Sequence, residues 1–121
     1  SREVYIAETD KEARQKALKG MLGRVWGEYL LPLFRSYDML SLFKHQPEVP
    51  DSDVTLEYLA DYVWLVGSPK TVTQKLGDMH EETGGFGCLL ALTFDQSENN
   101  EAWENSQRML IEEVLPNFAD A

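Results

Sequence analysis

Residues 67–71, Gly-Ser-Pro-Lys-Thr, have the types and spacing of a possible phosphate site. They form a turn ahead of a predicted helix, where backbone N–H groups and the helix dipole attract anions. The turn lacks the glycine spacing of a Walker loop or a GxGxxG motif. Ser is also a favoured N-cap, and Pro suits the first helical position because its missing N–H would be unpaired there. We interpret the turn as a helix cap, with phosphate binding as the weaker alternative.

A second glycine-rich segment, Gly-Gly-Phe-Gly at 84–87, resembles a phosphate loop by composition alone. Phosphate loops follow a parallel strand and lead into a helix, whereas this segment follows a helix and precedes a strand. Glycine is the preferred residue just after a helix ends. The segment is therefore predicted to terminate a helix.

Metal ligation is not predicted. His45 and His80 have no second His or Cys at ligand spacing, and the single cysteine, Cys88, excludes a multi-cysteine zinc site. Cys88 has no basic neighbour in sequence and lies in an apolar run, so we expect an inert core thiol. One acidic cluster lacks the pattern of a calcium loop and is predicted to favour a helix N-terminus. Its members are Asp95, Glu98, Glu101 and Glu104.

In a parallel α/β fold, the polar groups that carry chemistry gather at the carboxyl ends of the strands. Here those groups are Glu8 and Thr9 after the first predicted strand, and Thr93 to Asp95 around the end of the last. We take Glu8, Thr93 and Phe94 as the candidates for an active face.

Five elements must position these residues, and they form one unit over 1–121. The run at 3–7 predicts a strand, and Thr9 predicts the cap of the helix that opens residues 10–60, a helical and irregular insertion. A helix is expected over 68–83 and a last helix over 99–115. The nearly unbroken apolar run 86–94 is typical of a strand covered on both faces.

This order is that of an α/β protein with parallel strands. Two strands do not make a stable sheet, and their open edges need partners. We therefore expect the missing strands to come from a longer parent chain or from other copies of this chain.

Composition narrows the function classes. The chain has 121 residues and a net charge of −10, which fits one globular domain and disfavours nucleic acid and anionic membranes as partners. No apolar run reaches the length of a membrane span, and the N-terminal residues lack the layout of a signal peptide. We expect a cytoplasmic protein.

Three stretches together resemble the C-terminal part of the bacterial luciferase-like, flavin-dependent monooxygenases. They are EVYIAETDKEA, VWLVGSPKTVTQKLGDMHEETGGFGCLLALTFD and SQRMLIEEVLPNFA. The stretch DVTLEYLADYVWLVGSP adds a closer similarity to members that act on limonene- or alkane-type substrates. The resemblance implies the C-terminal part of a (β/α)8 TIM-type barrel, about its last two βα units plus a helical insertion.

The resemblance also implies a chemistry. Family members use reduced FMN, usually supplied by a separate flavin reductase, and O2 to oxygenate a small apolar organic substrate. The insertion lies over the barrel mouth in the family, so the candidates for a substrate pocket are Trp26, Phe34, Tyr37 and Phe43. No catalytic residue is carried over, because the isolated chain is expected to lack a complete active site. Two alternatives stay open: a non-catalytic assembly module that forms a homo-oligomer, and a deazaflavin-dependent oxidoreductase of the same fold.

Overall fold

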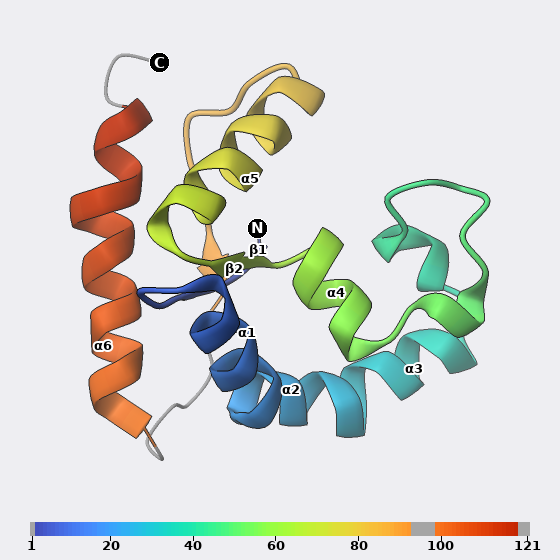
Figure 1. Ribbon diagram of the computed structural model, residues 1–121. Coiled ribbons are helices and arrows are strands. Elements are labelled where there is room, and N and C mark those ends of the chain that lie inside the picture. The colour runs from blue at the N-terminus through green and yellow to red at the C-terminus, as the bar shows by residue number, and fades with distance from the viewer. Residues whose placement is uncertain (1, 93–98, 119–121) are drawn as a thin grey trace.

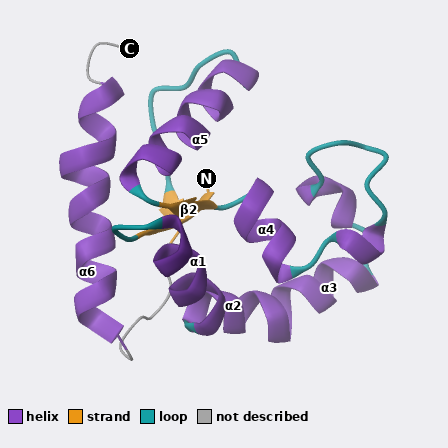
Figure 2. Cartoon of the chain, viewed as in Figure 1, coloured by secondary structure: helices purple, strands orange, loops and turns teal. Residues whose placement is uncertain are grey.

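The computed structural model describes residues 2–92 and 99–118 as a small parallel sheet flanked by helices (Figures 1 and 2). The strands are β1 (Arg2–Ile6), β2 (Leu65–Gly67) and β3 (Ala91–Leu92). The α-helices are α1 (Asp10–Lys19), α2 (Met21–Val25), α3 (Leu31–Ser36), α4 (Leu56–Tyr62), α5 (Pro69–Glu82) and α6 (Asn100–Met109).

β1 is the central strand, and the strand order is β2-β1-β3. Its pairing with β2 is parallel and aligns Tyr5 with Val66. Its pairing with β3 is also parallel but involves only Arg2 and Glu3. The carboxyl ends of β1 and β2 therefore meet at one edge of the sheet.

The two faces of β1 pack against different helices. Tyr5 and Ala7 belong to a core cluster that includes Ala13 and Ala17 of α1 and extends to α2 and α4. Val4 and Ile6 belong to a second cluster with α5 and α6. Since successive strand residues point to opposite faces, helices cover the sheet on both sides. Figure 1 shows this arrangement, with α5 on one side of β1 and β2 and α1 on the other.

Local sequence explains how the helices start. Thr9 caps α1 through its side chain, which accepts a hydrogen bond from the Glu12 N–H, as the sequence predicts. Ser68 caps α5 in the same way by accepting from the Thr71 N–H, and Pro69 takes the first helical turn. Both caps satisfy N–H groups that have no partner inside the helix.

The insertion contains one long helical run around Pro32. The run passes from α2 through a π-helical turn, Trp26–Leu30, into α3, and Pro32 lies in the first turn of α3. Proline has no N–H to donate to the preceding turn, and a π-turn re-spaces the backbone hydrogen bonds at that point. Pro32 therefore does not separate two helices, although proline in a helix interior commonly breaks one.

The last helix continues beyond its predicted end. α6 is followed by a π-helical turn, Leu110–Val114, and a 3-10 turn, Leu115–Phe118. Pro116 directly follows the predicted end at residue 115, and the 3-10 turn accepts it because no backbone N–H is required at that position.

The prediction of two strands was wrong, since the described residues form three. β2 was missed because a three-residue strand directly after a helix gives no alternation to detect. The strand order also differs from that of a closed barrel, in which consecutive strands are neighbours, because β1 here lies between β2 and β3.

The prediction that 86–94 is the best-buried strand was also wrong for its described part. Only Ala91 and Leu92 are in a strand, Leu90 is 65% exposed and Leu92 40% exposed. β3 lies at the edge of the described sheet and shares a two-residue ladder with β1, so the run is only partly buried, with Phe86, Leu89 and Ala91 against the second core cluster. Cys88 is exposed for the same reason and is not a core thiol.

Along residues 2–92 and 99–118, no helix is both long enough and apolar enough to cross a membrane.

Candidate active face at the strand ends

The carboxyl ends of β1 and β2 form the part of the predicted active face that the structure describes. Beyond β1, Ala7 is buried while Glu8 and Thr9 are exposed. β2 ends at Gly67 and leads into the capped start of α5. The other two candidates, Thr93 and Phe94, lie outside the described residues. Glu8 thus lies, exposed, at the expected edge of the sheet.

A direct hydrogen bond joins the two strand ends. The Ser68 backbone N–H donates to Asp10 Oδ1 over 2.7 Å. This bond, followed by one from the Thr71 side chain, lowers the pKa of the Asp10 carboxyl below its usual value. This contact could not be predicted from the sequence, because the partners lie 58 positions apart.

Asp10 decides between the two interpretations of the turn at 67–71. Its carboxylate lies at the N-terminus of α5, where an anion is favoured by the backbone N–H groups and the helix dipole. The protein's own negative charge therefore takes the position that a phosphate would need. The turn is a helix cap with a built-in anion.

Gly67 makes room for this arrangement. Its φ of +155° is rarely adopted by other residues, and a Cβ there would lie 2.7 Å from Thr71 Cγ2 and 2.9 Å from Asp10 Oδ1. Backbone and side chains are thus in contact at the end of β2. A Gly-Ser-Pro turn is visible in the sequence, but its dependence on Asp10 is not.

A small cleft opens beside the end of β1, against α1 and α6. Its volume is about 90 Å³. Charged groups on its wall include the pair Lys16 Nζ to Glu12 Oε1, 2.6 Å apart, and Arg108. Burial raises the pKa of the Tyr5 phenol, which also lines it. Ligand pockets usually hold about 300–1,000 Å³, so this cleft fits a few waters and not a flavin ring system.

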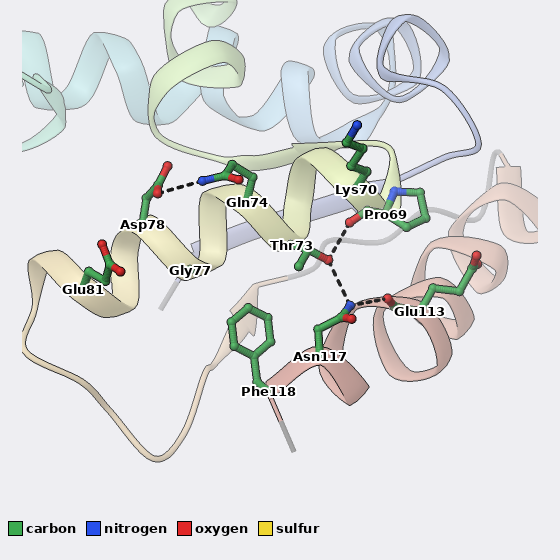
Figure 3. Close-up of a pocket in the computed structure, with 10 residues that line it drawn as sticks. All are labelled: Pro69, Lys70, Thr73, Gln74, Gly77, Asp78, Glu81, Glu113, Asn117 and Phe118. Atoms are coloured by element: carbon green, nitrogen blue, oxygen red, sulfur yellow. Dashed lines mark hydrogen bonds between the residues drawn. The ribbon is translucent and has the colours of Figure 1, made fainter. Parts of the chain in front are cut away.

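A larger cavity of about 480 Å³ lies away from the strand edge, between α5 and the turns after α6 (Figure 3). Asn117 Nδ2 closes one side by donating to Thr73 Oγ1 and to the Glu113 carbonyl. Carboxylates of Asp78, Glu81 and Glu113 surround it, and Lys70 is its only basic lining residue. It is an open, mainly acidic groove that would repel a phosphorylated cofactor.

Three of the four predicted pocket aromatics come together. Trp26 is 4% exposed and packs against Phe34 and Phe43, with ring centroids 6.0 and 5.2 Å away, and against Trp64 at 5.8 Å. Tyr37 lies apart from this aromatic cluster and is 70% exposed. None of the four lines any of the cavities described above.

The two histidines have aromatic neighbours. His45 stacks on Tyr62, with centroids 4.2 Å apart, and its ring nitrogen contacts the Tyr58 hydroxyl. His80 lies against Phe86. Within the described ranges, no group of three or more His, Cys, Asp or Glu residues could hold a metal ion.

Comparison with known proteins gives relatives of one kind. No protein-family model matches the chain. The enzyme 2,5-diketocamphane 1,2-monooxygenase 2 of Pseudomonas putida is 35% identical over 119 residues, which are 97% of this chain and 33% of that protein. The 3,6-diketocamphane 1,6-monooxygenase of the same organism is 36% identical over 116 residues, 96% of this chain and 31% of that protein. The chain thus spans about a third of the length of the curated relatives it matches.

A solved structure agrees. The oxygenating constituent of 3,6-diketocamphane monooxygenase from Pseudomonas putida, a type II Baeyer-Villiger monooxygenase in complex with FMN, superposes with a TM-score of 0.89 and 36% identity, over 95% of this chain and 32% of that one. The finer resemblance to limonene- or alkane-type enzymes stays a prediction. Over nearly its whole length, the chain is homologous to the diketocamphane monooxygenases, which are luciferase-like, FMN-dependent enzymes, and it matches about a third of the length of each.

Proposed function

We propose that this chain is part of a monooxygenase that uses reduced FMN and O2 to insert an oxygen atom next to the carbonyl group of an apolar cyclic ketone. The observation that carries the proposal is the 36% identity and TM-score of 0.89 to an FMN-bound Baeyer-Villiger enzyme over 95% of the chain. When bound, reduced flavin supplies the two electrons that reduce the second oxygen atom of O2 to water.

The described residues do not form a flavin site by themselves. The cleft at the end of β1 holds only about 90 Å³, and Asp10 occupies the anion position at the start of α5. We therefore assign FMN binding to the assembled enzyme, in which this chain contributes the sheet edge with Glu8 and the insertion. A separate flavin reductase would supply the reduced cofactor, since the solved relative is itself an oxygenating constituent.

The insertion is proposed to contribute to the apolar substrate pocket. Tyr37, at 70% exposure, has a ring available for contact with a ligand. Trp26, Phe34 and Phe43 pack together, apart from Tyr37, and we assign these three rings a structural role in the insertion. This division of roles follows from burial, because a packed ring cannot also offer its face to a substrate.

A chimera tests the proposed function. The matched third of the Pseudomonas putida 3,6-diketocamphane enzyme is replaced by this chain, and oxygenation of a bicyclic ketone is measured with chemically reduced FMN. We expect a lactone to form, one molecule for each reduced FMN whose oxidation is coupled to oxygenation of the ketone. A chimera that folds and binds FMN but forms no oxygenated product would contradict the proposal.

The isolated chain provides the second measurement. Its solution mass is determined by light scattering, with and without FMN, while flavin absorbance is followed across the peak. We expect no retained FMN. Stoichiometric FMN retention would contradict the assignment of the flavin site to the assembled enzyme. An inactive chimera, together with a stable oligomer of the isolated chain, would instead favour the assembly module.

A deazaflavin-dependent oxidoreductase is the other alternative. The chimera distinguishes it, because a deazaflavin does not activate O2 for oxygenation in place of FMN. If product forms only with reduced FMN, the deazaflavin alternative is excluded for this chain.

A further inference from the structure

The outer edge of β2 has backbone carbonyl groups that face away from β1. The backbone groups of Leu65 and Gly67 point toward β1, since the Ala7 N–H donates to the Gly67 carbonyl over 3.2 Å. Residues that alternate with them, Trp64 and Val66, must therefore direct their backbone groups outward. In a larger parallel sheet, a neighbouring strand would pair with these groups.

The side-chain ammonium group of Lys75, on α5, donates hydrogen bonds to these carbonyls. Its Nζ lies 3.2 Å from the Val66 carbonyl oxygen, 3.5 Å from that of Trp64 and 2.9 Å from that of Ala60, near the end of α4. An ammonium group has three N–H donors, so the three contacts match its full donor capacity. One lysine side chain therefore occupies hydrogen-bonding positions that a neighbouring strand would use.

The opposite edge of the sheet shows the same device with different chemistry. Within residues 2–92 and 99–118, β3 pairs with β1 at Arg2 and Glu3, in the first half of β1. In the second half, the Ile6 N–H donates to Ser106 Oγ of α6 over 2.8 Å, and Ser106 is completely buried. At the β2 edge a side-chain donor, Lys75, thus pairs with backbone carbonyls, and at the β1 edge a side-chain acceptor, Ser106, pairs with a backbone N–H.

We propose that Lys75 and Ser106 are edge caps, whose side chains hold hydrogen-bonding positions that a neighbouring strand would use and so hinder strand pairing of the isolated chain with a second copy of itself. Unpaired strand edges are templates for pairing with another chain, and charged lysines are a known way of blocking them. The segment that would pair is residues 88–92 of the second copy, since Leu90 and Leu92 are exposed and apolar there. This inference does not depend on the proposed function.

Three variants test the role of Lys75. Lys75→Met keeps the aliphatic stem and removes all donors, Lys75→Arg keeps donors, and Lys70→Met is a matched control at an exposed position of the same helix. Each is compared with the unmodified chain by light scattering at equal concentrations, with circular dichroism as the check of folding. We expect the weight-average mass of Lys75→Met to rise about two-fold above that of the unmodified chain, as for dimer formation. Lys75→Arg and Lys70→Met should not change it.

A second substitution identifies the pairing segment. Adding Leu90→Lys to Lys75→Met places a charge on the exposed run, and we expect it to reverse the rise in mass. If Lys75→Met raised the mass only by destabilising the fold, the additional Leu90→Lys substitution would not lower the mass again.

Ser106→Ala keeps the proposal falsifiable if Lys75→Met does not fold. It removes the acceptor at the other edge while Lys75 stays in place, and we expect it also to raise the mass. The proposal is overturned if every folded variant of Lys75 and Ser106 keeps the mass of the unmodified chain. It is equally overturned if association occurs but Leu90→Lys leaves it unchanged.

Discussion

Asp10 accepts a 2.7 Å hydrogen bond from the backbone N–H of Ser68, and this bond ties the end of β1 to the start of α5. The two residues are 58 positions apart. The bond holds two strand ends in register at the edge where an active face is expected. It also places a fixed negative charge there.

Asp10→Ala should destabilise the chain at neutral pH. The change removes a charged acceptor at a helix N-terminus, where such losses cost about 1 kcal/mol. Asp10→Asn should cost less, because the amide oxygen still accepts the bond. Chemical unfolding at pH 7 measures both, with Asp53→Ala at an exposed position as the control.

The effect of Asp10 should also depend on pH. Its folded-state pKa is lowered, so the stabilisation is present above the unfolded value of 3.8 and is lost as pH falls through the folded-state pKa. The unfolding free energies of the unmodified chain and Asp10→Asn should therefore converge below pH 3.8. A constant difference from pH 7 down to acid pH would show that the carboxylate charge is not responsible.

Gly67→Ala should destabilise the same corner for a steric reason. The new methyl group would lie 2.7 Å from Thr71 Cγ2, at a backbone φ that alanine rarely adopts. We expect a loss of about 1–3 kcal/mol. Gly87→Ala is the control, because a Cβ there meets nothing within 4 Å.

Thr71→Ser in the Gly67→Ala background separates the clash from the backbone strain. Serine lacks the Cγ2 atom but keeps the hydroxyl group near Asp10. We expect part of the stability measured by thermal unfolding to return. If the double variant is no more stable than Gly67→Ala, contact with Thr71 is not the cause of the loss.

The sequence predicts features that depend on near neighbours. Thr9 and Ser68 were identified as helix caps and do cap α1 and α5, because the cap hydroxyl accepts from a backbone N–H only three positions away. Contacts between distant positions were missed, including Asp10 with Ser68 and Lys75 with Val66. Nothing in a single sequence pairs such residues.

The apolar run 86–94 illustrates a different limit. Its composition favours a strand covered on both faces, but coverage depends on which strands are beside it. Here the ladder has two residues, and Leu90 is exposed. The same residues would be buried in an enzyme that supplies a second neighbouring strand. Composition therefore indicates that a segment is compatible with burial, and not which elements it contacts.

Glu3→Gln should stabilise the chain at neutral pH. Glu3 is 7% exposed, and burial raises the pKa of its carboxyl above the usual 4.5. A raised folded-state pKa means that its contribution to stability is fully present below pH 4.5 and is lost as pH rises through the folded-state value. Glutamine avoids burying a charge, and we expect a gain of about 1 kcal/mol, or about 4 °C in Tm.

Calorimetry at two pH values checks this prediction. The advantage of Glu3→Gln over the unmodified chain should be full above the raised folded-state pKa, shrink as pH falls from that value toward 4.5, and be absent below 4.5. Glu48→Gln, at an exposed loop position, should change Tm by less than about 1 °C. An advantage that grows on acidification would mean that the sign of the shift is wrong.

Variants of Tyr37 and Trp26 should distinguish a ring that contacts the substrate from one that only packs inside the insertion. Trp26→Leu removes a ring that is 4% exposed and packed among three aromatic neighbours, so we expect a loss of about 2–4 kcal/mol in the isolated chain. Tyr37→Ala removes a ring that is 70% exposed, and its effect on stability should stay within about 0.5 kcal/mol. In the chimeric monooxygenase, Tyr37→Ala should instead raise KM for the ketone by about 10-fold, because Tyr37 is the exposed ring among the four candidate pocket aromatics. This is the loss expected from one apolar contact of about 1.4 kcal/mol. An unchanged KM, with kcat also unchanged, would remove Tyr37 from the substrate pocket and leave the insertion with a purely structural role.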